Sequence, residues 1–148
     1  MADLSQMRSL VIERFIAIEG LMAVTICQHY FGKVPKAFLL DVLLDEQFSF
    51  GLKRRILFKI APLLKVQIES DIGRLNTIRN YFAHVGVGIL DTAKPGQPAR
   101  FPDPRDPTKS VDFTKLHDSF TSLEEPVLKA LRAHLLKIGG SLVPVLTP

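Results

Sequence analysis

One segment of the sequence groups side chains that could act on a phosphate. Residues 76–84 read Asn-Thr-Ile-Arg-Asn-Tyr-Phe-Ala-His. On an α-helix, residues four positions apart lie about 40° apart around the axis, so Asn80 and His84 share a face. The long side chain of Arg79 can reach toward the same side. The segment therefore predicts a guanidinium, an amide and an imidazole close together at one end of a helix.

These three side-chain types suit the cleavage of a phosphodiester bond without a metal ion. A histidine such as His84 can accept a proton from a ribose 2′-OH, or donate one to the leaving oxygen, at neutral pH. Arg79 stays protonated and offers a planar set of donors to a phosphate, while Asn80 could position the imidazole or the substrate. The alternative is a structural role, because a histidine in the last turn of a helix can also hydrogen-bond the terminal carbonyl groups.

The string from Ile78 to His84 resembles the Arg-x4-His signature of the HEPN superfamily (higher eukaryote and prokaryote nucleotide-binding domains). Its Arg-Asn-x-Phe-Ala-His form is similar to proteins of the mannitol operon repressor type. The resemblance implies a small all-α bundle with the signature at a helix end. Many members of the superfamily are metal-independent ribonucleases that act as toxins or in phage defence. They are active as dimers in which two Arg–His pairs face each other.

Two functions follow from this resemblance. In the first, the chain is a HEPN-like, metal-independent endoribonuclease with Arg79 and His84 as its catalytic pair and Asn80 in support. As a toxin or defence component it would act on RNA as a homodimer, with a cognate antitoxin as a partner. In the second, the chain is a non-catalytic regulator or adaptor of the mannitol operon repressor type, in which the same residues form a structural network or hold a nucleotide.

A second group of candidate residues is basic. The stretch 47–68 contains no acidic residue and carries five cations, namely Lys53, Arg54, Arg55, Lys59 and Lys65. We expect the first four of these to bind an RNA backbone. Helical spacing places Arg55 and Lys59 on one face. The alternative is an ordinary solvated flank of a helix.

Composition limits the other classes of site. The chain has 148 residues, of which 19 are Lys or Arg and 15 are Asp or Glu, so its formal net charge of +4 permits an anionic partner without identifying one. Cys27 is the single cysteine, which excludes an intramolecular disulfide and a cysteine-based zinc site and favours a reducing, cytoplasmic compartment. The histidines show no metal-binding spacing and no Gly-rich phosphate loop is present, so we expect no metal and no cofactor. Charged residues interrupt the apolar stretches, and we expect no membrane segment.

Apolar residues at spacings of three and four predict the helices that position these groups. The expected helices cover residues 4–30, a segment opening at Pro35, residues 50–61, a segment ending near His84, and residues 116–138. Pro62 should separate the third helix from the fourth, because proline lacks an N–H and clashes with the preceding turn. About five helices predict an all-α antiparallel bundle, as in the HEPN superfamily.

Local signals predict where some of these helices begin. Asp3 followed by Gln6 predicts a capping box, and Ser49 is expected to cap the third helix. The last helix contains a second capping pattern over residues 122–125, which together with Pro126 predicts a kink or a restart midway.

The remaining segments complete a single HEPN-like helical domain over residues 1–148. Residues 86–112 are rich in proline and predict a long loop before the last helix. A short strand or hairpin around residues 110–113 is the alternative for the end of this loop. Residues 141–148 predict a short flexible tail.

Overall fold

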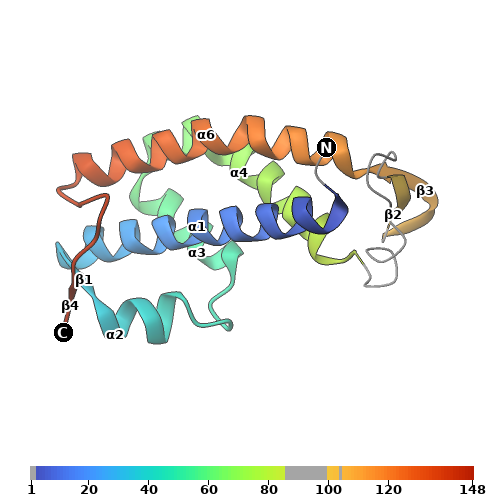
Figure 1. Cartoon of the computed structure of the whole chain (residues 1–148). Coiled ribbons are helices and arrows are strands. Elements are labelled where there is room, and N and C mark those ends of the chain that lie inside the picture. The colour runs from blue at the N-terminus through green and yellow to red at the C-terminus, as the bar shows by residue number, and fades with distance from the viewer. Residues whose placement is uncertain (1–2, 86–99, 104) are drawn as a thin grey trace. The chain divides into compact units, whose positions relative to one another are not determined.

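The computed structural model describes residues 3–85, 100–103 and 105–148, and 72% of these residues are helical (Figure 1). The helices are α1 (Leu4–Phe31), α2 (Lys36–Phe38), the π-helix η1 (Leu39–Leu43), α3 (Phe50–Ile60), α4 (Pro62–Ala83) and α6 (Phe113–Lys137). The strands are β1 (Val34–Pro35), β2 (Arg100–Asp103), β3 (Asp106–Asp112) and β4 (Leu146–Thr147). The mainly helical class is therefore confirmed, with short strands in addition. Within the described residues, no helix combines the length and apolar character that crossing a membrane requires.

The predicted caps form at the starts of α1 and α3. The Gln6 N–H donates to Asp3 Oδ1 at 2.7 Å and the Asp3 N–H donates to Gln6 Oε1 at 3.2 Å, which completes the capping box. Ser49 Oγ accepts a hydrogen bond from the Leu52 N–H at 3.3 Å at the start of α3. At the other end of α1, Gly32 has a φ of 63°, the left-handed conformation that glycine adopts most easily after a helix.

Pro62 separates α3 from α4, as predicted. Ala61 is the residue between the two helices, and Pro62 is the first residue of α4. Proline is well tolerated at this position because its missing N–H would have no partner inside the helix. The predicted apolar stripe of α4 is buried along its length; it consists of Ile68, Ile72, Leu75, Ile78 and Phe82.

The last helix does not restart midway, so that part of the prediction was wrong. α6 continues through Pro126 as a single helix. The Ser122 hydroxyl donates to the Ser119 carbonyl at 2.9 Å and does not cap a new helix. Proline removes one backbone hydrogen bond here, but Ser122 is exposed, so water can solvate its carbonyl. The helix begins at Phe113, where Asp112 Oδ1 accepts a hydrogen bond from the Lys115 N–H at 3.1 Å.

Part of the predicted proline-rich loop over residues 86–112 is a β-hairpin. β2 and β3 pair antiparallel, with Arg100 opposite Asp112 and an irregularity between Pro102 and Asp103. The prolines suggested a loop, but proline is accepted in edge strands whose N–H positions face outward. The first part of the predicted loop, residues 86–99, lies outside the described residues.

The predicted tail also contains regular structure. β4 pairs in parallel with β1, with Val34 opposite Leu146 and Pro35 opposite Thr147. Backbone pairing therefore holds part of the segment that we expected to be a flexible tail. The sequence offered no strong signal for it, because the two strands have only two residues each.

Backbone contacts divide the chain into two compact units. Unit 1 comprises Met1–Phe15 and Ser70–Glu125, and unit 2 comprises Ile16–Glu69 and Pro126–Pro148. The boundaries fall inside α1, α4 and α6, so each of these helices contributes residues to both units.

Unit 1 has an aromatic core and a partly buried ion pair between two of its helices. The rings of Phe82 and Phe113 meet edge to face with centroids 5.1 Å apart. An Arg14 Nη1–Glu124 Oε2 ion pair of 2.7 Å joins α1 to α6, and the Glu124 side chain is only 11% exposed. Its largest fully buried side chains include Leu4, Phe15, Ile72, Leu75, Phe82, Phe113 and Phe120. This core fixes the second half of α4, which carries the residues of the predicted site.

Unit 2 has an aliphatic core. Its buried cluster consists of Ala23, Val24, Ile26, Cys27, Val34, Leu39, Leu43 and Leu135. Burial raises the pKa of the Cys27 thiol, because a desolvated thiolate is unfavourable. Cys27 therefore acts as a small apolar residue in the core of unit 2.

Candidate functional site

The three residues of the predicted catalytic group lie at the C-terminal end of α4 in unit 1. Arg79 and Asn80 are in the last turn and a half of the helix and are half-buried, and His84 is exposed and follows the last helical residue. The His84 N–H donates to the Asn80 carbonyl at 3.1 Å, which continues the helical pattern by one residue. The His84 imidazole is thus exposed to solvent directly after the end of α4.

The end of α4 is capped by an arginine from α1 and not by His84. The Phe82 carbonyl has no partner within the helix; it accepts from Arg8 Nε at 3.2 Å and from the Val85 N–H at 3.4 Å. The His84 side chain forms no hydrogen bond or ion pair within the part of the chain that the structure describes. Arg8 therefore takes the capping role that was the alternative for His84. Arg8 was not predicted from the sequence to have this role.

Arg79 packs on an aromatic ring of α1. Its guanidinium carbon lies 4.8 Å from the centroid of the Phe15 ring, within the range of a cation–π interaction. A guanidinium that lies over a ring still has its N–H donors at its edge. Phe15 therefore limits the positions of the guanidinium and leaves donors that a phosphate oxygen could reach.

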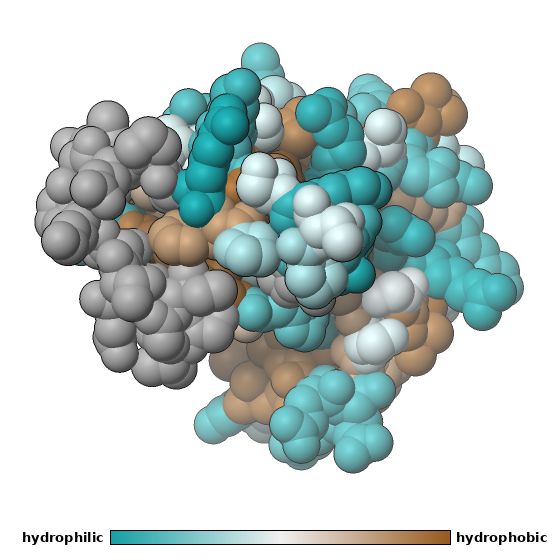
Figure 2. Space-filling model, turned by 90° about the vertical axis from the view of Figure 1, so that its right-hand side faces the viewer, coloured by the Kyte–Doolittle hydropathy of each residue, from teal (hydrophilic) through white to brown (hydrophobic). Residues whose placement is uncertain are grey.

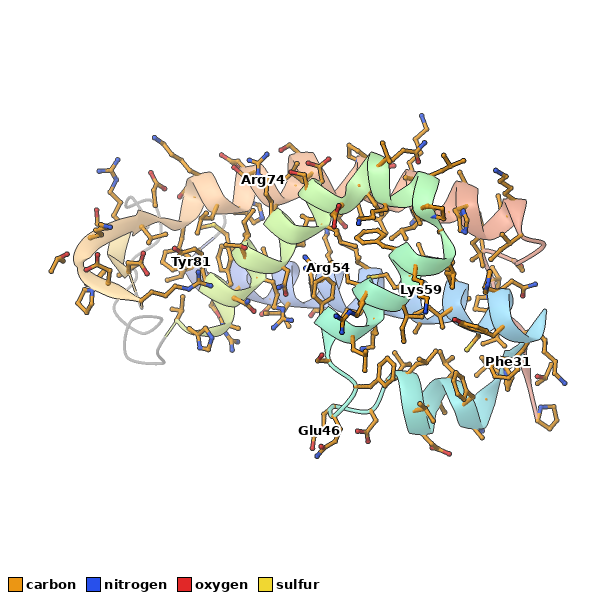
Figure 3. All side chains as sticks on the ribbon, turned by 180° about the vertical axis from the view of Figure 1, so that it is seen from behind. Phe31, Glu46, Arg54, Lys59, Arg74 and Tyr81 are labelled. Atoms are coloured by element: carbon orange, nitrogen blue, oxygen red, sulfur yellow. The ribbon has the colours of Figure 1, made fainter. Side chains whose placement is uncertain are left out.

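A residue inside the motif attaches the β2–β3 hairpin to α4. The Tyr81 hydroxyl donates to Asp103 Oδ2 at 3.3 Å, and the Arg105 N–H donates to Asp103 Oδ1 at 2.8 Å (Tyr81 is labelled in Figure 3). The Arg105 guanidinium carbon lies 4.8 Å from the centroid of the Tyr81 ring. A second arginine is thus held at the α4 segment that carries Arg79. Asp103 and Arg105 were not predicted as site residues, because their segment was expected to be a long loop.

Figure 2 is seen from the side on which Figure 1 shows β2 and β3, and both hydrophilic and apolar residues lie at the described surface there.

The predicted basic group separates into two environments within unit 2. Lys53 is only 5% exposed, and its Nζ lies 3.5 Å from Glu19 Oε1 of α1. Lys53 therefore differs from the other three residues predicted to contact RNA, because its ammonium group is buried and paired with a carboxylate. Helical spacing alone could not show that Glu19 lies opposite it.

The other cations of this group line a cleft of about 600 Å³, which we call the basic cleft. It is formed by the side chains of Arg54, Arg55 and Lys59 from α3 and of Lys65 and Glu69 from α4, together with Phe58 and the first residues of α3. Arg54 and Lys59 are labelled in Figure 3. The structure therefore brings Arg54, Arg55 and Lys59 together, as their predicted role in RNA binding requires.

The described residues contain no group of three or more His, Cys, Asp or Glu side chains arranged to hold a metal ion.

In the rest of unit 2, burial lowers the pKa of His134, and the nearby charges of Lys137 and His29 lower it further. Among the described residues, His134 Nε2 is buried and has no hydrogen-bond partner.

We compared the chain with protein-family models, with curated proteins and with solved structures. No family model, curated protein or solved structure matches it. The resemblance of residues 78–84 to the HEPN signature is therefore an expectation from the motif. A function for this chain has to be inferred from its own residues.

Proposed function

We propose that this chain is a metal-independent endoribonuclease in which His84 transfers protons and Arg79 binds the reacting phosphate. The observation that carries the proposal is the state of His84: its side chain is exposed at the end of α4 and has no partner within the described residues, while Arg8 performs the capping. A histidine that serves only the fold is expected to be buried or hydrogen-bonded. An exposed histidine a few residues from a positioned arginine suits acid–base chemistry on an anion.

In this mechanism His84 removes the proton from a ribose 2′-OH. The 2′-oxygen then attacks the adjacent phosphorus, and the bond to the 5′-oxygen of the next nucleotide breaks. The products are a 2′,3′-cyclic phosphate and a free 5′-OH, once the leaving oxygen has received a proton. Arg79 stabilises the charge that develops on the phosphate oxygens, and Asn80 positions the imidazole or the substrate.

The reaction needs both a base and an acid, which bears on the oligomeric state. One His84 per chain supplies one of the two groups in a given step. A homodimer whose two Arg79–His84 pairs face each other supplies both the base and the acid. This is the arrangement implied by the resemblance of the motif to the HEPN signature, whose proteins are antiparallel helical bundles. We include this homodimer in the proposal, with a cognate antitoxin as the partner that restrains the activity.

The test compares wild type with His84→Ala on mixed RNA in the presence of EDTA. His29→Ala is the matched control, because His29, like His84, is an exposed histidine at the C-terminal end of a helix, here α1. We expect cleavage by wild type and His29→Ala and a loss of about 10²-fold or more in His84→Ala. Circular dichroism verifies that each variant keeps its helices. Equal activity in His84→Ala and wild type would refute the assignment of His84.

A non-catalytic regulator is the second candidate, and the position of Arg79 favours it. An arginine that packs over Phe15 contributes to the fold in addition to any contact with a ligand. This candidate predicts that wild type leaves RNA intact, while Arg79→Ala should lower the free energy of unfolding by about 1 kcal/mol under either candidate. Cleavage of RNA by wild type in EDTA, lost in His84→Ala, would exclude it.

A further inference from the structure

The basic cleft of unit 2 is strongly positive for its size. Four of its charged side chains are cationic and one, Glu69, is anionic, which leaves a net charge of +3. Lys65 Nζ and Glu69 Oε1 are 3.9 Å apart, and both side chains are about half exposed, so this pair is weak. Glu69 therefore neutralises little of the positive charge in the cleft.

The three cations from α3 lack counter-charges. Within the described residues, the side chains of Arg54, Arg55 and Lys59 form no hydrogen bond or ion pair. Arginine cannot lose its proton at ordinary pH, so two of these charges are permanent. Cations held close together repel one another, and a bound anion removes that repulsion. Lys53 differs from these three residues, because its ammonium group is paired with the Glu19 carboxylate.

The cleft recognises charge more than apolar surface. Phe58 is its one aromatic residue and is only 7% exposed, so it offers little area on which a nucleobase could stack. The first turn of α3 adds Ser49 and Gly51 to the lining, and the N-terminus of a helix carries a partial positive charge. A volume of about 600 Å³ is large enough for several phosphate groups.

We propose that the basic cleft binds a ligand with several adjacent phosphate groups. Four cations in one concavity match a chain of phosphates better than a single phosphate, which would leave most of them without a partner. Two sources share this chemistry: the phosphodiester backbone of an RNA strand and a free polyphosphate chain. The site contains neither His84 nor Arg79, so the proposal is independent of cleavage at the end of α4.

The experiment measures binding to the full chain by fluorescence anisotropy. The probe is a fluorescein-labelled 2′-O-methyl oligouridylate, which lacks the 2′-OH and cannot be cleaved by the proposed mechanism. Inorganic tripolyphosphate and inorganic phosphate are the competitors. The cleft variant is Arg54→Ala with Lys59→Ala, and the control is Lys129→Ala with Arg132→Ala, which removes two exposed cations of α6 in the same unit.

We expect the cleft variant to weaken binding by about tenfold or more and to lower the dependence of log K on log salt by about one to two. The control should stay within about twofold of wild type. Displacement of the probe by tripolyphosphate but not by phosphate would identify a compact polyphosphate ligand. Binding of the probe without such displacement would identify an RNA backbone. The proposal is overturned if neither tripolyphosphate nor the oligonucleotide binds, or if both double variants lose affinity equally.

Discussion

The ion pair between Lys53 and Glu19 allows a quantitative test of our interpretation that Lys53 is a structural residue, whereas Arg54, Arg55 and Lys59 belong to the basic cleft. Nζ and Oε1 are 3.5 Å apart, with the two side chains 6% and 21% exposed. Two unit charges at this distance attract by about 5 kcal/mol at an effective dielectric constant of about 20. Desolvation of the buried ammonium opposes most of this attraction, so we expect a coupling energy of about 1–2 kcal/mol.

The assay is a double-mutant cycle of Lys53→Met, Glu19→Gln and the double variant, measured by urea unfolding. Lys53→Met alone should lower the free energy of unfolding by about 2 kcal/mol, because it leaves Glu19 with only partial access to water. The double variant should recover most of that loss, since it removes both charges and keeps the volume. Lys53→Met should also bind the oligonucleotide probe of the basic cleft as wild type does. A coupling energy near zero, or a loss of affinity equal to that of the cleft variant, would refute our interpretation of Lys53.

Three further predictions concern other residues. Tyr81→Phe removes the hydrogen bond to Asp103, so it should lower the free energy of unfolding by about 0.5–1.5 kcal/mol and speed amide hydrogen exchange in the β2–β3 hairpin; unchanged exchange would contradict this anchoring role. Burial raises the pKa of Cys27, so iodoacetamide should label its thiol slowly in the folded chain and rapidly in urea, and equal rates would show that the core of unit 2 is open. Burial, together with the charges of Lys137 and His29, lowers the pKa of His134 in the folded chain. As the pH falls, the unfolded chain therefore binds more protons than the folded chain, and the free energy of unfolding decreases. His134→Gln should therefore show a smaller drop in melting temperature between about pH 7.5 and about pH 5 than wild type, and an identical drop would contradict the assignment.

The ends of the helices could be predicted from the sequence where a few adjacent residues determine them. Asp3 and Gln6 close a capping box through contacts three residues apart, and Pro62 fixes the start of α4 by its own geometry. The apolar stripe of α4 followed from periodicity, because a helix of that length must bury one face. These features depend on local chemistry, which the sequence displays directly.

Other features depend on residues that are distant in the sequence. Lys53 looked like a surface cation among others, and its burial results from Glu19 on another helix. Asp103 looked like part of a loop, but it is buried and hydrogen-bonded to Tyr81. In each case the missing information was the identity of a partner, which spacing does not contain.

The same distinction applies to the candidate active site. The spacing of Arg79 and His84 fits two roles. The two side chains can act on a substrate as a catalytic pair, or they can stabilise the end of the helix by hydrogen bonds to its last carbonyl groups. Two residues of α1 separate the roles: Arg8 satisfies the Phe82 carbonyl, and Phe15 lies under the Arg79 guanidinium. His84 is thereby left without a structural task in the described residues, whereas Arg79 has one. A variant of His84 should therefore affect cleavage with little change in stability, while a variant of Arg79 should affect both. For this reason His84 is the decisive position for the proposed function.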